Sequence, residues 1–449
     1  MDWYTRFVSG ALFPLHEWAK GHRTLAVLKR LEDSQWRSRD QIEEFRVARL
    51  RELLVHAAKT VPYYRQLFET LGVEVKSIKQ VADLARLPLL DKATIRAHLG
   101  QLKSSRARGL SPCATGGSSG EPLRFFVGAS RRAHDIAAKW RATRWWGVDI
   151  GDPEIVVWGS PIELGAQDGL RRVRDWLMRS ELMPAFSLTE RHMAECLARI
   201  AQKRPAMLFG YPSALAMLAR HAVNRGWRLA DAGVKVAFVT AERLYDNQRE
   251  VISRAFGCAV ANGYGARDAG FLAHECKSGG MHIMAEDVIV EIVDGAGRPL
   301  PAGRAGEIVV THLASGDFPF IRYRTGDIGV LDEGECACGR GLPMLREIQG
   351  RSTDFVVAED GTVMHGLALI YVLREMPGLA QFRIIQESRT LTRVEVVRGE
   401  GFSAETVRDI QQGLCARLGK GVVVEVATKP YLHADPSGKF RYVQSKVAA

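Results

Sequence analysis

A short segment rich in glycine and hydroxyl side chains, Thr115–Pro122, has the residue types that bind phosphate groups. It holds three glycines and three hydroxyls in eight residues, and a β-prone run, Leu123–Val127, follows it. Glycines let backbone amides approach a ligand closely, so amides and hydroxyls can together surround an anion. The segment lacks the Gly-Lys-Ser/Thr ending of a Walker loop, which excludes that site class. The candidate phosphate-binding residues are Thr115, Gly116, Gly117, Ser118, Ser119 and Gly120. A flexible Ser/Gly loop is the alternative interpretation.

Four further segments carry side chains suited to nucleotide chemistry, namely Tyr264–Asp268, Tyr323–Asp327, Gly350–Asp354 and Ser437–Arg441. A carboxylate accepts hydrogen bonds from a vicinal diol and is a hard oxygen ligand for Mg²⁺. Arginine and lysine offset the charge of phosphate groups. Three of these segments also have a structural interpretation: Asp327 in a plain turn, Asp268 as a helix cap, and Lys439 as a solvated lysine of the chain end. Single motifs of this length are weak signals, and their joint presence favours function.

Two pairs of cysteine and histidine residues have the side chains of a closed metal site. Cys276 and His282 form one pair, and Cys336 and Cys338 form the other, both in turn-like segments with glycines. Thiolate and imidazole are the ligands of tetrahedral structural zinc, although this spacing is not that of a common zinc finger. His274 is a competing ligand, and four residues without a metal are the alternative. The other cysteines, expected to be packing residues, are Cys113, Cys196, Cys258 and Cys415.

The composition is that of a globular protein with a marked excess of positive charge. The 449 residues include 62 Lys and Arg against 51 Asp and Glu, a net charge of +11. This balance favours anionic partners such as nucleotides, CoA, nucleic acid or a membrane surface. No apolar run reaches the length of a transmembrane segment, and the N-terminal region lacks the ordered parts of a signal peptide. The seven cysteines therefore do not indicate a disulfide framework, and we expect a cytoplasmic location.

Helices are expected over residues 1–70 and after the glycine-rich segment. Apolar residues from Asp40 onward recur at helical spacing, and this pattern ends at Pro62–Tyr64. Arg131–Trp146 is typical of a basic helix. Its favoured interpretation is a solvated cationic face over an aromatic core, and a phosphate-binding surface is the alternative. Ser187 and Glu190 form a capping box that predicts the start of another helix.

Strands alternate with helices through the middle of the chain, which predicts a parallel sheet with helical crossovers. Ligands bind beyond the carboxyl ends of such strands, where Gly210–Pro212 and the group Gly263, Tyr264 and Gly265 are expected. Hairpin patterns follow from Asp287. We therefore expect an α/β fold: a large N-terminal domain with a mostly parallel sheet, helices and a small β-barrel-like layer, and then a small, mobile α+β domain. The expected parts are a helical region (1–70), an α/β region (71–285), a β layer (286–350) and a C-terminal lid domain (351–449).

The order and spacing of the five segments resemble the adenylate-forming superfamily of acyl-CoA synthetases. Within it, the chain is most similar to the phenylacetate-CoA ligase branch with its capsule-biosynthesis (CapK-like) and coenzyme F390 synthetase-like relatives. Three segments carry the similarity to this branch in particular: Pro62–Arg65, Gly210–Ser213 and Gly438–Tyr442. The resemblance covers nearly the whole chain, and it implies the fold and the chemistry of these enzymes.

The resemblance implies roles in nucleotide binding. Thr115–Gly120 would bind the leaving pyrophosphate, Asp327 would accept hydrogen bonds from both ribose hydroxyls, and Tyr264 would stack near the adenine. Asp268 stands where the superfamily usually has a glutamate that helps to hold Mg²⁺. Arg267 stands where a Thr or Ser often contacts phosphate, and this departure leaves its role open.

The resemblance also implies roles for the C-terminal domain and for a metal. Arg351 would meet the ribose-phosphate and mark a hinge, and Lys439 would neutralise the α-phosphate and the carboxylate during adenylation. Some relatives carry zinc at the place of the four Cys and His residues. We expect this ion to be a structural staple near the Asp268 loop.

Several functions compete at this stage. The leading hypothesis is ATP-dependent, Mg²⁺-assisted activation of a carboxylic acid to an acyl-adenylate, followed by transfer to CoA. Other acceptors are an amine, a carrier-protein thiol or a sugar hydroxyl in polysaccharide biosynthesis, and AMP transfer itself is a related variant. A basic, non-catalytic protein that binds nucleic acid or membrane is opposed by the presence of Asp327 and Lys439. We expect a small carboxylic acid and CoA, or another acyl acceptor, as partners, and no nucleic acid. A homodimer is left open.

Overall fold

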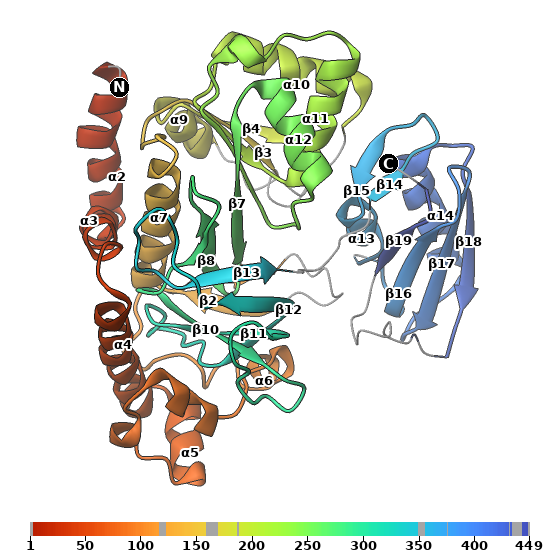
Figure 1. Ribbon diagram of the computed structural model, residues 1–449. Helices are drawn as coiled ribbons and strands as arrows, with labels where there is room; N and C mark the ends of the chain where they lie inside the picture. The colour runs from red at the N-terminus through yellow and green to blue at the C-terminus, as the bar shows by residue number, and fades with distance from the viewer. Residues whose placement is uncertain are drawn as a thin grey trace.

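The computed structural model describes residues 3–115, 123–158, 169–185, 188–348, 355–374, 376–430, 432 and 442–447. Along the chain, N-terminal helices are followed by a large sheet with its covering helices and then by a C-terminal α+β unit (Figure 1). Within the described ranges, no helix is both long and apolar enough to cross a bilayer.

The region predicted to be helical, residues 1–70, forms helices in the structure from Trp3 onward, and shorter helical segments continue to Ala97. The helices are α1 (Trp3–Phe7), α2 (Phe13–Ala19), α3 (Thr24–Ser34), α4 (Arg39–Thr60), α5 (Pro62–Leu71) and α6 (Lys92–Ala97), with a π-helical turn η1 (Val8–Leu12) and 3₁₀ turns η2 (Val75–Ser77) and η3 (Val81–Arg86). A capping box of Ser38 and Gln41 starts α4. Pro62 occupies the first turn of α5, where its missing N–H is not needed, so the predicted helix ends at Thr60 and a second one begins.

One sheet of eleven strands forms the body of the molecule. Its strands are β3 (Glu154–Trp158), β4 (Ser180–Pro184), β5 (Met207–Gly210), β6 (Val236–Thr240), β7 (Ala259–Ala266), β8 (Gly270–Glu275), β9 (Met281–Ile283), β10 (Val288–Val293), β11 (Ala305–His312), β12 (Tyr323–Asp332) and β13 (Met344–Ile348). Their order is β10-β11-β12-β13-β9-β8-β7-β6-β5-β3-β4. The pairs from β4 to β7 are parallel, and those from β7 to β10 are antiparallel. The expected β layer is thus hydrogen-bonded to the parallel strands, and β7 joins the two halves.

Helices cover both faces of the parallel half. They are α7 (Ala129–Arg144), α9 (Gly169–Leu177), α10 (Glu190–Lys203), α11 (Pro212–Asn224) and α12 (Asp246–Phe256), with a 3₁₀ turn η4 (Ala230–Ala232). Residues of α10, α11 and α12 pack on one face of the sheet, and α7 packs on the other. The N-cap of α10 is Thr189, whose hydroxyl accepts a hydrogen bond from the amide of His192, not the expected Ser187, which lies outside the described residues.

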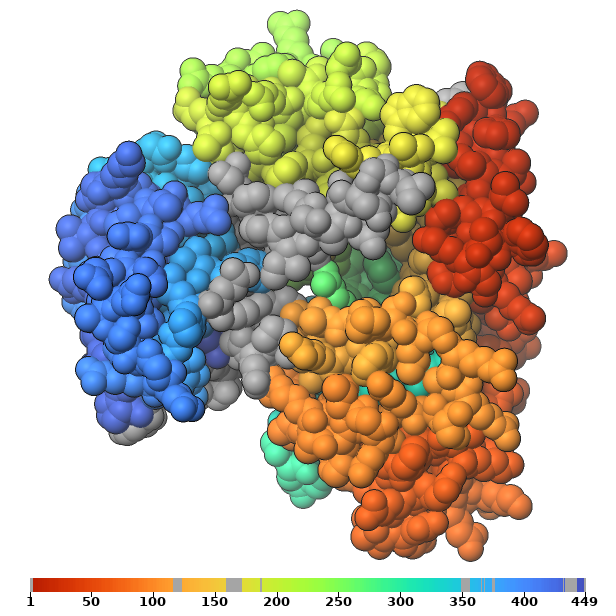
Figure 2. All heavy atoms as spheres, turned by 180° about the vertical axis from the view of Figure 1, so that it is seen from behind, coloured from red at the N-terminus to blue at the C-terminus, as the bar shows by residue number. Residues whose placement is uncertain are grey.

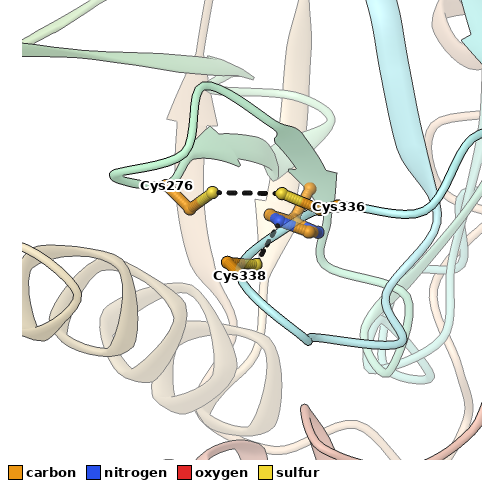
Figure 3. Close-up of side chains that lie close together, drawn as sticks. Cys276, Cys336 and Cys338 are labelled. Carbon is orange, nitrogen blue, oxygen red and sulfur yellow. Dashed lines mark hydrogen bonds between the residues drawn. The ribbon is translucent and has the colours of Figure 1, made fainter.

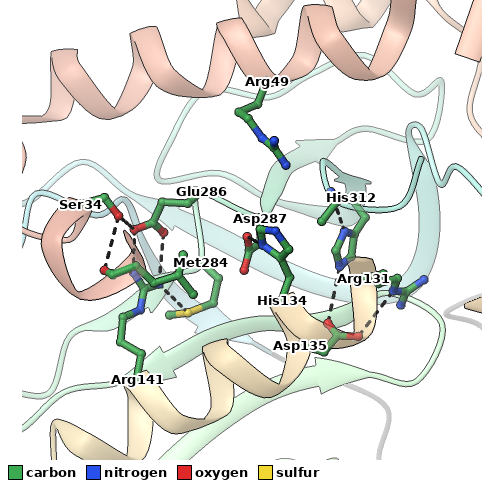
Figure 4. Close-up of polar contacts among 12 residues, drawn as sticks. Ser34, Arg49, Arg131, His134, Asp135, Arg141, Met284, Glu286, Asp287 and His312 are labelled. Atoms are coloured by element: carbon green, nitrogen blue, oxygen red, sulfur yellow. Dashed lines mark hydrogen bonds and ion pairs between the residues drawn. The ribbon is translucent and has the colours of Figure 1, made fainter. Parts of the chain in front are cut away.

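The basic helix α7 corrects the expectation of a solvated cationic face, because two of its arginines are buried. Arg141 is fully buried and makes two contacts with the Glu286 carboxylate, at 2.6 and 3.1 Å (Figure 4). Arg131, only 1% exposed, lies 3.6 Å from the Asp135 carboxylate. A buried guanidinium requires such partners, because removing its charge from water is costly. These arginines therefore anchor α7 to neighbouring strands and turns, and the phosphate-binding alternative is not needed to explain them.

Two further groups of strands lie outside the main sheet. β1 (Ser111–Ala114) and β2 (Arg124–Val127) pair as an antiparallel hairpin on either side of the glycine-rich segment. The C-terminal unit contains β14 (Phe355–Val357), β15 (Val363–His365), α13 (Leu367–Arg374), β16 (Leu379–Gln386), β17 (Leu391–Arg398), α14 (Ala404–Leu418), β18 (Val423–Thr428) and β19 (Val443–Ser445). Its four-stranded sheet β18-β17-β16-β19 packs with α13 and α14 around a separate hydrophobic core, as the α+β prediction requires.

Candidate active site

A cavity of about 570 Å³ lies where the parallel half of the sheet meets the antiparallel half. It is lined by the turn after β6, the second half of β7, the β7–β8 turn, and parts of β12 and β13. Seven residues predicted for the site line this cavity: Thr115, Gly263, Tyr264, Gly265, Arg267, Asp268 and Asp327. They come from three separate segments of the chain, so the fold brings the predicted motifs together.

Tyr264 and Asp327 are in direct contact in the wall of the cavity. The hydroxyl of Tyr264 donates a hydrogen bond to a carboxylate oxygen of Asp327 at 3.0 Å. The amide of Asp327 donates to the hydroxyl of Thr325, which itself donates to the carbonyl of Ile308 on the adjacent strand. These bonds fix the carboxylate as a set of acceptor atoms at the cavity wall, which suits a ligand with adjacent hydroxyl groups.

Asp268 is held firmly in the β7–β8 turn and does not cap a helix. It is 6% exposed, and its carboxylate accepts hydrogen bonds from the hydroxyl of Tyr323 at 2.5 Å and from the amide of Ala269 at 3.2 Å. The guanidinium of Arg131 donates to the backbone carbonyl oxygens of Arg267 and Asp268. A carboxylate has about four lone-pair positions, so two bonds leave acceptor capacity for a cation.

Arg267 connects the β7–β8 turn to the start of the glycine-rich segment. Its side chain is exposed, and it donates to the carbonyl oxygen of Ala114 at 3.2 Å. The next residue, Thr115, makes two hydrogen bonds with Leu123. Its backbone amide donates to the Leu123 carbonyl, and its side-chain hydroxyl accepts from the Leu123 amide, each at 3.0 Å. A guanidinium therefore lies beside the entrance of the predicted phosphate-binding turn.

Other predicted site residues lie outside the described part of the chain. They are Gly116, Gly117, Ser118, Ser119, Gly120, Arg351 and Lys439. Their roles remain predictions from the sequence.

The turn that follows β6 also lines the cavity and was not predicted from the sequence. Residues Ala241, Glu242, Arg243 and Leu244 line the cavity, and Ala241 has a positive φ of 73°. The guanidinium of Arg243 lies 3.8 Å from the carboxylate of Glu347 on β13. A non-glycine residue with positive φ is uncommon and often marks a functional turn. The position of this turn at the carboxyl end of a parallel strand was the signal that would have found it.

Aromatic side chains adjoin the cavity at the ends of β3 and β5. Tyr211 lines the cavity, and its ring stacks on Trp158 with 4.2 Å between centroids. Phe209 lies 6.0 Å from Trp158, and the ammonium of Lys139 lies 4.8 Å from the Phe209 ring. The structure thus places apolar rings beside the polar cavity, on the side where α7 covers the sheet.

The four predicted metal ligands converge. The Sγ atoms of Cys276 and Cys336 are 3.5 Å apart, and Cys338 Sγ is 3.2 Å from His282 Nε2 (Figure 3). The ligand atoms of all four residues lie within 4.8 Å of one another. The three thiols and the one imidazole form a Cys₃His donor set, which is common at structural zinc sites.

The surroundings of the cluster fit a bound ion. A Cβ atom at Gly280 would come within 2.6 Å of Cys336 Sγ and 3.2 Å of His282 Nε2, so glycine leaves room for the ligands. Nδ1 of His282 contacts the carbonyl of Leu342 at 3.3 Å, which leaves Nε2 as the ligand atom. Burial lowers the pKa of His282 to about 4, so the imidazole is neutral at pH 7. The expected competitor His274 is not in the cluster; it is fully buried between Phe238 and Phe271.

The known proteins most relevant to this sequence agree with the resemblance drawn from its motifs. No model of a protein family matches the chain. Phenylacetate-coenzyme A ligase of Thermus thermophilus is 27% identical over 328 residues, which cover 71% of this chain and 72% of that protein. Protein CapK of Staphylococcus aureus is 22% identical over 454 residues, or 98% of this chain and 96% of CapK. The similarity to the expected branch therefore extends over most of the length of each protein.

Solved structures give the same fold. A 2-hydroxyisobutyryl-CoA ligase in complex with 2-HIB-AMP and CoA superposes with a TM-score of 0.64 and 21% identity, covering 91% of this chain and 90% of that one. A second structure of that ligase, in the postadenylation state, gives a TM-score of 0.61 and 21% identity, with 92% and 91% covered. The chain is therefore similar in sequence to the phenylacetate-CoA ligases and CapK and shares the fold of 2-hydroxyisobutyryl-CoA ligase, in agreement with the resemblance of its motifs to the adenylate-forming superfamily.

Proposed function

We propose that this protein activates a carboxylic acid with ATP and then transfers the acyl group to CoA. In the first step, a carboxylate oxygen attacks the α-phosphorus of ATP, and the bond to the β-phosphate oxygen breaks to release pyrophosphate. In the second step, the CoA thiol sulfur attacks the acyl carbonyl carbon and AMP leaves. The observation that carries the proposal is the meeting of Thr115, Tyr264, Asp268 and Asp327 around one cavity.

The described residues support a division of roles within that cavity. Asp327, fixed by Tyr264 and Thr325, accepts hydrogen bonds from the ribose hydroxyls. Arg267 lies beside the glycine-rich segment, so its charge offsets the phosphate groups. Asp268 has acceptor capacity for Mg²⁺, which when bound neutralises phosphate charge. Lys439 would neutralise the charge of the α-phosphate and the carboxylate, and Arg351 would contact the ribose-phosphate.

The acid occupies the aromatic side of the cavity in this proposal. Trp158 and Tyr211 stack at its edge, so they form an apolar contact for an acid with an aromatic or bulky hydrocarbon group. The carboxylate end then lies toward the turn of Asp268 and Arg267. This placement favours acids that carry an aromatic or bulky hydrocarbon group.

The Cys₃His cluster is proposed to hold Zn²⁺ as a structural ion. All four positions of a tetrahedral ion are supplied by protein side chains, which leaves no place for an activated water. The cluster joins the β8–β9 turn to the loop before β13, so the ion would fix two segments whose strands line the cavity. A cytoplasmic location and a homodimer are proposals that rest on the sequence alone.

A pyrophosphate-exchange assay with a panel of carboxylic acids tests the function. We expect acid-dependent incorporation of labelled pyrophosphate into ATP, greatest for aromatic or bulky acids. Loss of free CoA thiol, measured with the best acid, then tests the acceptor. Exchange without CoA consumption would indicate an amine, carrier-protein thiol or sugar hydroxyl as the acceptor. AMP transfer to a substrate without a carboxylate would contradict the proposed acid activation.

A further inference from the structure

The N-terminal helix exposes an apolar face to solvent. α1, η1 and α2 continue one another from Trp3 to Ala19, because Phe7, Leu12 and Phe13 at their junctions all have right-handed helical dihedral angles. One side of this helix is buried against the body of the protein through Thr5, Val8, Phe13 and Glu17. The outward side carries Trp3 (77% exposed), Phe7 (49%), Leu15 (61%) and Trp18 (77%). A surface helix normally presents polar residues to water, so this face is unusual.

The π-helical turn accounts for the alignment of these side chains. Positions four apart lie on one side of an α-helix with a small angular drift, and the wider π turn drifts in the opposite sense, which offsets it. Phe7 and Leu15 are eight residues apart, with exposed Ala11 midway between them inside Val8–Leu12. The turn thereby brings the aromatic residues before and after it into one stripe.

Helix α9 extends the same surface. The hydroxyl of Tyr4 donates to the carbonyl of Leu177 at 2.9 Å, and the guanidinium of Arg179 lies 5.6 Å from the Tyr4 ring, so α1 and the end of α9 are in contact. α9 exposes Val173 (57%) and Trp176 (71%), three residues apart on one side. Figure 2 shows the N-terminal helices in red beside α9 in yellow. We call the six residues Trp3, Phe7, Leu15, Trp18, Val173 and Trp176 the aromatic face.

Positive charge accompanies the aromatic face. The helix that carries the face, with Lys20 directly after it, and residues 169–179 together contain six Lys or Arg and two acidic residues. One of the two, Glu17, is buried and bonded to His16, His22 and Thr24, and the other, Asp175, pairs with Arg174. Arg6, Lys20 and Arg172 are exposed. The field over this surface is therefore positive, which attracts an anionic partner.

A groove of about 320 Å³ opens between α2 and α9. Phe13, Trp140 and Met178 contribute apolar surface to it. Its charged lining residues are Lys20 and Arg174 together with Glu17, Glu154 and Asp175. The groove therefore combines apolar walls with charged groups of both signs. The groove is separate from the cavity of the proposed active site, since no residue lines both.

We propose that the aromatic face binds the surface of an anionic lipid bilayer. Indole rings favour the membrane interface, and a helix with Trp, Phe and Leu among basic residues is the pattern of an interfacial anchor. A second copy of the chain fits less well, because a symmetric dimer would bring the same basic residues together. Single-stranded nucleic acid fits less well too, because Leu15 and Val173 provide no ring for stacking on bases. The protein would then carry out its reaction next to a membrane.

Vesicle co-sedimentation tests the proposal with the full chain. We expect binding to vesicles of phosphatidylcholine with phosphatidylglycerol and little binding to phosphatidylcholine alone. Tryptophan emission should shift to the blue on binding, and affinity should fall between about 50 and about 300 mM NaCl because salt screens the attraction. The double variant Trp3→Ser/Trp18→Ser should lose at least about tenfold in affinity. Circular dichroism establishes that the variants are folded.

A matched pair of leucine variants separates the aromatic face from general surface hydrophobicity. Leu15→Ser should weaken binding, whereas Leu71→Ser, an equal change at a 44% exposed position on α5, should not. The proposal is overturned if wild-type protein fails to bind anionic vesicles, or if the double variant binds them as well as wild type. It is also overturned if the double variant instead dissociates a dimer seen by light scattering, or loses affinity for a single-stranded oligonucleotide rather than for vesicles.

Discussion

The guanidinium of Arg131 donates a hydrogen bond to the backbone carbonyl oxygen of Asp268, with 2.7 Å between Nη2 and the oxygen. Arg131 belongs to α7 and Asp268 to the β7–β8 turn, so this bond connects a helix on one side of the sheet to the wall of the cavity. Arg131 is itself placed by Asp135 on the same helix (Figure 4). Arg131 therefore positions a turn that the proposed reaction uses, although it does not itself line the cavity.

Arg131→Gln is expected to lower both stability and activity. The change leaves two carbonyl oxygens and the Asp135 carboxylate with one partner fewer, so we expect about 3 kcal/mol less unfolding free energy. Pyrophosphate exchange should fall at least about tenfold in kcat with little change in the KM for ATP, because Asp268 is displaced and Asp327 is not. The matched control is Arg132→Gln on the next position, where the guanidinium donates to Ser111 and touches no cavity residue. Equal losses in both variants would contradict the positioning role.

Asp327→Ala is expected to weaken ATP binding. Hydrogen bonds to a charged acceptor contribute about 1.5–3 kcal/mol, so the KM for ATP should rise about ten- to a hundredfold. Asp332→Ala is the control, since Asp332 lies on the same strand and caps a turn at Gly334 away from the cavity. An unchanged KM for ATP in Asp327→Ala would remove this carboxylate from the nucleotide site.

Lys439→Ala is expected to separate the two half-reactions. Loss of its charge should slow adenylation about a hundredfold or more, while transfer to CoA from preformed acyl-adenylate stays largely intact. Lys446→Ala serves as the control, because Lys446 is an exposed lysine of the same chain end that pairs with Glu387. Similar slowing of both half-reactions would argue against a role confined to adenylation.

Cys338→Ser is expected to remove the metal. Wild-type protein should contain close to one zinc ion per chain, and the variant much less, with a lower midpoint of thermal unfolding. Chelation of the wild type should lower the midpoint similarly, whereas Cys415→Ser, which keeps a donor for the carbonyl of Val422, should do neither. Wild-type protein that contains no zinc as isolated and binds none when zinc is added would contradict the structural metal site.

The parts of the fold that local pattern controls were predictable. Strand–helix alternation and the C-terminal α+β unit follow from periodicity and turn residues, and the structure confirms them. The grouping of Cys276, His282, Cys336 and Cys338 was predictable for another reason, because thiols and imidazole are rare and chemically specific.

The remainder depends on contacts between distant residues. Arg141 is buried because Glu286 meets it from 145 positions away, and no local pattern contains that pairing. The continuity of the sheet requires β9 to pair with β13, which lies about sixty residues later in the chain. The turn at Ala241–Leu244 was not predicted because its residues match no motif. Only its position after β6, beside the cavity, indicates a role in the site.

The unbroken sheet has a consequence for how the protein melts. β7 hydrogen-bonds to β6 on one side and to β8 on the other. Unfolding of only the parallel or only the antiparallel half would therefore leave an unpaired strand edge and separate the two hydrophobic cores. The described chain up to Ile348 should therefore lose its order in a single calorimetric transition. The C-terminal α+β unit has its own sheet and its own core. It should therefore unfold in a second, smaller calorimetric transition that is independent of the first.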